Sequence, residues 1–356
     1  MFVNGKPQRS IWQDRRTGVV QIIDQTQLPH KLKIVELICL NDAVKAIAIM
    51  QVRGAPLIGA TAAYGIALAM DGQSDLKTLQ MARQHLYEAR PTAVNLRWAL
   101  DRMQHTLDNC SPTDWSRIAW QEARRIADED VATNSAIGDN GCQLLREISE
   151  HKPVGEPINI LTHCNAGWLA TVDWGTALAP IYKAHDAGLN IHVWVDETRP
   201  RNQGASLTTW ELSNHGVANT LIVDNAGGHL MQRGQVDLCI VGSDRTTLNG
   251  DVCNKIGTYL KALAAFDNQV PFYVALPRST VDSTLEHGMD IPIEERGGDE
   301  VTKIQGQRSD GIIDQVSLVG INTLACNPAF DVTPARLISG YICETGVSNE
   351  IKTLLN

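Results

Sequence analysis

From Pro157 onward the chain alternates short apolar runs with segments of helical periodicity, and this alternation limits its fold more than any other feature. The runs typical of strands are Ile158 to Thr162, Ile191 to Val195, Thr220 to Val223, Leu238 to Val241 and Pro271 to Ala275. We expect the intervening helices to begin near Trp168, Gly204, Ala226 and Lys255. Alternating strands and helices predict a parallel sheet covered on both faces, joined by right-handed crossovers as in a Rossmann-like domain. No GxGxxG follows the first strand, so no dinucleotide is implied.

The first part of the chain has a different pattern, mostly helical with a small sheet. Short β-like runs occur at 19–23 and 32–35, and helical patterns occur at 41–52, 60–70, 76–89, 96–107 and 115–148. At 356 residues the chain exceeds the size at which a single core stops growing. We therefore expect an α/β protein of two domains, a helical N-terminal domain at 1–130 and a Rossmann-like catalytic domain at 131–356.

Charge and cysteine usage exclude several classes of protein. The net charge of −9 argues against non-specific binding of nucleic acid, because the chain has no excess of positive charge to neutralise many phosphates. A few arginines can still hold a small anion. The eight cysteines include no CxxC pair, and no His/Cys/carboxylate cluster has metal-ligand spacing, so we expect no metal. The sequence contains no apolar window long enough to cross a membrane and no signal-peptide pattern at residues 1–6, which predicts a cytoplasmic protein.

Ligands of such sheets lie outside the carboxyl ends of the strands, and two of those ends carry reactive side chains. Cys164 follows the first strand and precedes a predicted helix at 168–184, a position that favours a thiolate or an anion beside the thiol. Asp244 follows the strand at 238–241, where the sheet and a bound ligand can desolvate its carboxyl group and suit it to donate a proton. The alternatives are an inert packed cysteine, and an aspartate that caps a helix or pairs with Arg245.

Three basic motifs have the form of anion sites. Arg53 precedes Gly54 and Ala55 at a predicted helix start, where backbone N–H groups and a guanidinium can approach a phosphate together. Arg90 is a second candidate anion ligand, placed beside a stiff turn at Pro91 and Thr92. The third motif is Asn254 and Lys255, which open the predicted fourth helix of the second domain. Each could instead be an ordinary surface charge. Gln203 is neutral and could hydrogen-bond sugar hydroxyls.

These residues fall within motifs that resemble the methylthioribose-1-phosphate isomerases, in the superfamily of the α, β and δ subunits of translation initiation factor 2B. The matching stretches, in the family's order, are 52–56, 90–96, 162–167, 197–200, 242–245, 249–251, 254–259, 291–296 and 327–334. The resemblance implies that Cys164 and Asp244 are catalytic. It also implies that the substrate is bound by Arg53, Gly54, Ala55, Arg90, Gln203, Asn254 and Lys255.

The resemblance further implies a homodimer that converts 5-methylthioribose 1-phosphate to 5-methylthioribulose 1-phosphate in methionine salvage, without a cofactor. The chemistry suits the residues, because a C1 phosphate locks the sugar ring, so an acid must protonate the ring oxygen before hydrogen moves between C2 and C1. The sequence leaves open whether that hydrogen moves through an enediol or as a hydride. It also leaves open another sugar 1-phosphate, such as 5-deoxyribose 1-phosphate or ribose 1,5-bisphosphate, because the family often has an arginine where this chain has Gln203-Gly204-Ala205-Ser206. A non-catalytic regulatory subunit is a further alternative.

Overall fold

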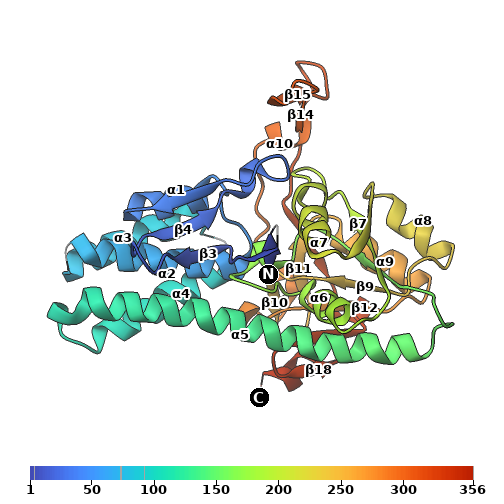
Figure 1. Cartoon of the computed structure of the whole chain (residues 1–356), viewed down its shortest axis with the longest axis horizontal. Coiled ribbons are helices and arrows are strands. Elements are labelled where there is room, and N and C mark those ends of the chain that lie inside the picture. Colours follow the sequence, from blue (N-terminus) through green and yellow to red (C-terminus); the bar gives the residue numbers. More distant parts are fainter. Residues whose placement is uncertain (4, 73, 92, 356) are drawn as a thin grey trace.

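The computed structural model describes residues 1–3, 5–72, 74–91 and 93–355, and it consists of two halves joined by one long helix (Figure 1). Thr92, the last residue of the second basic motif, lies outside the described residues. No helix in the described part of the chain is long and apolar enough to cross a membrane.

The N-terminal half packs a three-stranded antiparallel sheet against a group of helices, as its sequence pattern predicts. Its sheet consists of β3 (Ile11–Gln13), β4 (Val20–Ile23) and β5 (Ile34–Leu37). Its helices are α1 (Leu40–Ala48), α2 (Ala55–Gly72), α3 (Leu76–Ala89) and α4 (Val94–Asp108). A short hairpin, β1 (Phe2–Val3) and β2 (Lys6–Pro7), precedes them. Helix α2 is the centre of this half, because most of its alanines and glycines are buried and allow α1, α3, α4 and α5 to pack closely around it.

The C-terminal half is built on a seven-stranded sheet that confirms the α/β fold class. Its strands are β6 (Ile158–Thr162), β7 (Ile191–Asp196), β8 (Ala218–Ile222), β9 (Leu238–Val241), β12 (Phe272–Ala275), β17 (Gly340–Cys343) and β18 (Gly346–Ser348). All neighbouring pairs are parallel except β17 with β18. The five predicted strands are all present, and the two at the carboxyl end of the chain were not predicted.

The strand order creates a crevice beside β6. The order β18-β17-β12-β9-β6-β7-β8 means that the chain first moves from β6 to β7 and β8 and then returns to add β9, β12 and β17 on the other side. Connections therefore leave β6 and β9 in opposite directions, and in open α/β sheets such a switch point opens a ligand crevice at the carboxyl ends. Cys164 and Asp244 lie in the loops that follow these two strands, which end at Thr162 and Val241.

The helix predicted at 168–184 is wrong in its first part. Trp168–Ala170 form a single 3-10 turn, and α6 begins only at Ala179. Between them the chain folds back on itself, with a β-bridge between Gly167 and Gly175. The buried Glu211 carboxylate accepts the N–H groups of Trp168 and Leu169 at 2.9 Å each, and this contact from a distant helix fixes the irregular path.

The prediction that Asn254 and Lys255 open a helix is also wrong. Both residues end β11 (Val252–Lys255), which belongs to a second small sheet with β10 (Arg245–Thr247), β13 (Val281–Asp282) and β16 (Phe330–Thr333). Lys255 pairs with Phe330 of β16. This pairing with a segment far along the chain makes Lys255 part of a strand, which the local sequence pattern did not indicate. The remaining helices of this half are α6 (Ala179–Asp186), α7 (Thr209–His215) after a π-helical turn at Gly204–Thr208, α8 (Ala226–Gln232), α9 (Thr258–Asp267) and α10 (Asp299–Thr302).

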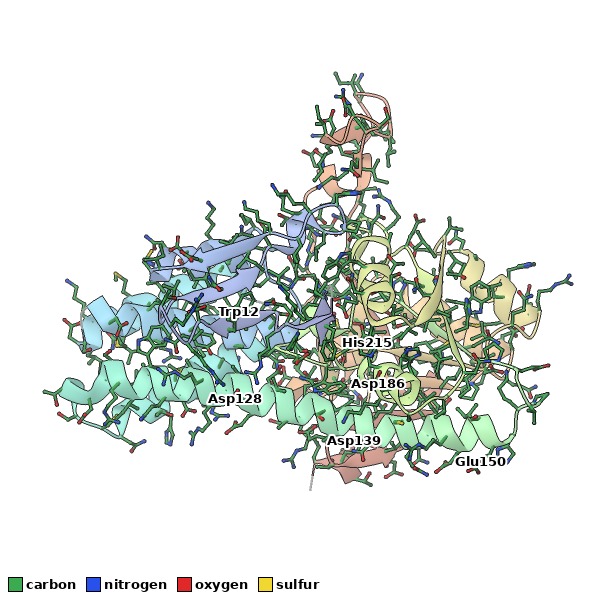
Figure 2. All side chains as sticks on the ribbon, viewed as in Figure 1. Trp12, Asp128, Asp139, Glu150, Asp186 and His215 are labelled. Atoms are coloured by element: carbon green, nitrogen blue, oxygen red, sulfur yellow. The ribbon has the colours of Figure 1, made fainter. Side chains whose placement is uncertain are left out.

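Helix α5 (Trp115–Glu150) runs along both halves, and Figure 2 shows Asp128, Asp139 and Glu150 spaced along its exposed side. Its apolar residues up to Val131 pack with the N-terminal core, and those from Ile137 pack with the core of the large sheet. We propose that the division between the two domains lies in this stretch of α5. Met1 and Val3 nevertheless belong to the core of the large sheet, so the start of the chain crosses that division.

A hairpin arm projects from the C-terminal half (Figure 1). Its strands, β14 (Lys303–Gln307) and β15 (Ile313–Ser317), pair antiparallel over five residues each. Several apolar side chains in and after the hairpin are at least 40% exposed: Ile312, Val316, Leu318, Val319, Ile321 and Leu324.

Candidate active site

A cavity lies where the carboxyl ends of β6 and β9 meet the N-terminal half. Eight of the nine predicted site residues line it: Arg53, Gly54, Ala55, Arg90, Cys164, Gln203, Asp244 and Lys255. The exception is Asn254, which is buried beside the cavity and donates from Nδ2 to Thr258 Oγ1 at 3.1 Å at the start of α9. Five of the lining side chains are arginine or lysine and one is a carboxylate, so the cavity favours an anionic ligand.

Cys164 is held at the cavity by its backbone. Its φ of +64° is in the left-handed region that residues other than glycine rarely adopt. Its N–H donates to Thr198 Oγ1 at 2.8 Å, and its carbonyl accepts from Thr208 Oγ1 at 2.7 Å. Because α6 begins fifteen residues later, at Ala179, the expected help from a helix dipole is absent at Cys164. The strained backbone and its two threonine anchors instead fix where the sulfur lies.

Arg53 connects the N-terminal half to the loop that carries Cys164. Its Nη1 donates to Asn165 Oδ1 and its Nη2 donates to the Asn165 carbonyl at 2.7 Å. Gly54 allows the backbone to approach Ala170 closely, because a Cβ at its position would lie 2.3 Å from the Ala170 carbonyl oxygen. Its φ of +94° also favours glycine. Helix α2 begins at the next residue, Ala55, so its positive end is at the cavity wall.

Lys255 is a buried cation on the cavity wall. Its Nζ donates to the Ala329 carbonyl at 2.9 Å and lies 4.5 Å from the centre of the Phe330 ring. Burial lowers the pKa of Lys255 to about 8, although the nearby Cys164 and Asp244 charges oppose that shift. Its charge therefore changes near neutral pH and couples to both candidate catalytic groups.

Asp244 lies in the short link between β9 and β10. Its N–H donates to the Cys253 carbonyl at 3.0 Å, which fixes its backbone against β11, and its side chain is partly exposed at the cavity. Cys253 also lines the cavity, and burial and the Asp244 charge raise the pKa of its thiol to about 12. The cavity thus holds a carboxyl group from one strand end and the Cys164 sulfur from the next.

Two polar groups in the cavity wall have hydrogen-bonding capacity that the described protein does not use. Gln203 is 5% exposed, and its Oε1 has no hydrogen-bond partner among the described residues. The buried Nε of Arg90 is likewise without a partner there. Buried polar atoms are normally satisfied, so both point to a polar ligand in the cavity.

Sequence reasoning assigned no role to nine residues that line the cavity: Met50, Ile58, Ala93, Arg245, Cys253, Ile291, Pro292, Arg296 and Phe330. Six of them lie in stretches that carried the family resemblance, which was the signal available for them: Ala93, Arg245, Ile291, Pro292, Arg296 and Phe330. The others come from the ends of neighbouring elements and are brought in by tertiary packing.

A buried charge cluster lies beneath Cys164. His163 Nδ1 is 2.9 Å from Asp196 Oδ2, and Asp224 is close enough that the three side chains could surround an ion. Lys261 occupies this cluster, with its Nζ 3.1 Å from Asp196 Oδ2 and donating to the Asp224 carbonyl. The lysine ammonium therefore supplies the positive charge that these carboxylates need.

Comparisons with known proteins agree with this fold. The profile of the Initiation factor 2 subunit family matches residues 51–350. The methylthioribose-1-phosphate isomerase of Rhodospirillum rubrum is 60% identical over 352 residues, which cover 98% of this chain and 90% of that one. A crystal structure of 5-methylthioribose 1-phosphate isomerase from Pyrococcus horikoshii is 38% identical, with a TM-score of 0.83 over 98% of this chain and 96% of that one. A structure described as translation initiation factor eIF-2B subunit delta from A. fulgidus is also 38% identical, with a TM-score of 0.81 over 98% of this chain and 99% of that one.

The fold and the basic cavity at its switch point define a two-part α/β protein, and the chain belongs to the Initiation factor 2 subunit family. Within that family it groups with the methylthioribose-1-phosphate isomerases, to which it is similar over nearly its whole length.

Proposed function

We propose that the protein is an aldose–ketose isomerase of methionine salvage that converts 5-methylthioribose 1-phosphate to 5-methylthioribulose 1-phosphate. The single observation that carries the proposal is the cavity in which Cys164 and Asp244 meet a set of arginine and lysine side chains. Full-length similarity to isomerases of this name supports the particular substrate.

The phosphate end of the substrate binds the basic side of the cavity. Arg90 offers an unpaired Nε, Lys255 offers a buried ammonium, and the start of α2 adds a positive end at Gly54 and Ala55. The unpaired Oε1 of Gln203 accepts a hydrogen bond from a sugar hydroxyl. These contacts orient C1 and C2 of the sugar toward the carboxyl ends of β6 and β9.

Asp244 acts as the acid that protonates the ring oxygen, so that the bond between C1 and that oxygen breaks. Hydrogen then moves from C2 to C1 while the C2 hydroxyl gives up its proton, which replaces the proton that Asp244 donated. This leaves a ketone at C2 and the phosphate on C1. Cys164 handles the proton or stabilises the charge at C2. Substrate and product have the same composition, so no oxidant or reductant is consumed.

Isotope incorporation distinguishes the two routes for that hydrogen. The reaction is run in D₂O, and the product is analysed for deuterium at C1 by NMR. Deuterium at C1 indicates an enediol whose proton exchanges with solvent, and its absence indicates hydride transfer or a proton transfer shielded from solvent.

Direct assay against three sugar phosphates tests the function. The purified protein is incubated with 5-methylthioribose 1-phosphate, 5-deoxyribose 1-phosphate or ribose 1,5-bisphosphate, and ketose formation is followed by NMR. We expect fastest turnover of the methylthio sugar. Faster turnover of either other sugar would reassign the substrate. No turnover of any would favour a non-catalytic subunit of a translation initiation factor, which is how the A. fulgidus relative is named.

We propose that the protein acts as a homodimer in the cytoplasm. Support for a dimer comes from the family resemblance, and the exposed apolar side chains of the hairpin arm are consistent with a surface that is covered in an assembly. All eight cysteines are free, which suits a reducing compartment. Light scattering that gives the mass of a monomer at micromolar concentration would overturn the dimer.

A further inference from the structure

We propose that Arg296, a residue to which neither the motifs nor the comparisons assign a role, is a direct ligand of the substrate phosphate. This inference rests on the proposed function for the identity of the ligand, but the site it describes would bind any phosphate monoester or inorganic phosphate. Arg296 lines the cavity, and its side chain is only 9% exposed.

Glu294 fixes the guanidinium of Arg296 from behind. Its Oε1 accepts from Arg296 Nε at 3.0 Å and its Oε2 accepts from Nη2 at 3.2 Å, which makes a two-point pair. The same Oε2 lies 3.3 Å from Arg90 Nη2. Glu294 does not itself line the cavity, whereas both arginines do. The carboxylate therefore approaches the two guanidiniums from the side away from the cavity, and it orients both without filling the space in front of them.

The aromatic ring of Phe330 brings Lys255 onto the same wall. Arg296 lies 5.5 Å from the centre of that ring and Lys255 Nζ lies 4.5 Å from it. Backbone hydrogen bonds connect residues 294–296 to residues 327–329. Arg296 N–H donates to the Asn327 carbonyl, and Ala329 N–H donates to the Glu294 carbonyl.

Arg90, Arg296 and Lys255 thus form one continuous cationic wall, contributed by both halves of the molecule. Mutual repulsion between buried cations disfavours such a wall unless an anion is present, and Glu294 balances one of its three charges. A phosphate dianion balances the remaining charge, and its three terminal oxygens match three separate donor groups. This wall identifies the phosphate subsite more fully than the predicted residues alone.

Equilibrium binding of inorganic phosphate tests the role of Arg296 independently of catalysis. Isothermal titration calorimetry is done on the full chain and on Arg296→Gln. We expect the dissociation constant to rise about tenfold or more in the variant, the usual scale for losing a charged hydrogen bond. Unchanged phosphate binding in Arg296→Gln would overturn the proposal, as would a wild-type protein that binds no phosphate.

Arg201→Gln is the matched control. Arg201 is also a partly buried arginine paired to a glutamate, Glu300 at 2.8 Å, but it does not line this cavity. We expect its phosphate affinity to stay within about twofold of wild type. An equal loss in both variants would mean that net charge, and not a direct contact, is responsible, and would contradict the proposal.

Arg296→Lys covers the case in which Arg296→Gln fails to fold. It keeps the charge but loses the planar fork that pairs with Glu294, so we expect folded protein with a severalfold weaker phosphate affinity. Wild-type affinity in Arg296→Lys would contradict a specific guanidinium contact. If the wild-type protein binds phosphate but isomerises no sugar phosphate, the proposed function fails, while the phosphate titrations still decide the role of Arg296.

Discussion

Cys164 differs from Cys253, the other cysteine of the cavity, in how the protein holds it. A left-handed backbone and two threonine hydroxyls fix Cys164, whereas Cys253 lies within β11 with its thiol kept neutral by burial. Strained backbone at a cavity wall is typical of functional residues, because surrounding contacts must maintain it.

We expect Cys164→Ser to fold normally and to lose nearly all turnover, because a hydroxyl is a far weaker base and nucleophile than a thiol at neutral pH. Initial rates with 5-methylthioribose 1-phosphate measure the effect, and circular dichroism checks the fold. Cys253→Ser is the control in the same cavity and should keep most of the activity. Wild-type turnover in Cys164→Ser would remove this sulfur from the mechanism.

The pKa of Lys255 predicts how phosphate binding depends on pH. Burial places that pKa at about 8, and only the protonated ammonium attracts a phosphate dianion. Its contribution to binding is therefore complete below about pH 8 and is lost as the pH rises through that value. Calorimetry with inorganic phosphate between pH 7 and pH 9.5 should show affinity falling more steeply in wild type than in Lys255→Gln. Parallel curves for the two proteins would assign the pH dependence to other groups.

At the residue level the sequence predicted eight residues that the structure brings to one cavity, but not the reasons for their geometry. Cys164 and Asp244 were found because they follow apolar strands, and a strand end is a local feature. The environment of Cys164 depends on Thr198 and Thr208, which come from other parts of the chain. Arg296 was given no role, although it lies in a stretch that carries the family resemblance, because its local pattern is that of an ordinary surface arginine.

At the level of elements, α5 shows how glycines that weaken a predicted helix can serve its packing. The helix is continuous through Gly138 and Gly141, and α6 lies directly against both. A Cβ at position 141 would be 2.4 Å from Pro180 Cγ. The glycines therefore allow the close crossing of α5 and α6 that connects the long helix to the large sheet.

We expect Gly141→Ala to lower the free energy of unfolding by about 1 to 3 kcal/mol, the usual effect of forcing a methyl group into a packed interface. Gly72→Ala is the control, because this helical glycine of α2 has nothing within 4 Å of its added Cβ. The control should be neutral or stabilising by up to about 1 kcal/mol, from helix propensity. Urea unfolding of the three proteins measures both changes, and equal stability of Gly141→Ala and wild type would contradict the packing argument.

The elements that sequence patterns located correctly are those with local periodicity, such as α3, whose bounds at Leu76–Ala89 coincide with the predicted range. The errors occur where distant segments decide the structure. Glu211 holds the irregular path after Gly167, and pairing with β16 makes Lys255 part of a strand. Periodicity carries no information about such partners.

At the level of the whole molecule, the cavity is shared between the two halves. Arg90 comes from the N-terminal half and meets Glu294 of the C-terminal half at 3.3 Å, while Arg53 reaches Asn165. Contacts across the cavity of this kind are suited to bring phosphate and sugar ring together and to exclude water when the substrate is bound.

We expect Arg90→Ala to weaken substrate binding by about 2 kcal/mol, because the variant loses a charged hydrogen bond to the phosphate. Calorimetric titration of 5-methylthioribose 1-phosphate into a slow variant such as Asp244→Asn, with and without Arg90→Ala, measures this change without turnover. Equal affinity in the two proteins would show that the N-terminal half does not contribute Arg90 to the site.

The central claim is that Asp244 and Cys164, brought together at the carboxyl ends of β9 and β6, isomerise a sugar phosphate. The most direct measurement is ketose formation from 5-methylthioribose 1-phosphate by wild-type protein and by Asp244→Asn, with substrate affinity determined in parallel. We expect wild type to form 5-methylthioribulose 1-phosphate, and Asp244→Asn to bind substrate nearly as well but to turn over at least about a hundredfold more slowly, the usual scale for losing a general acid. No ketose from the wild-type protein, or wild-type turnover by Asp244→Asn, would contradict the claim.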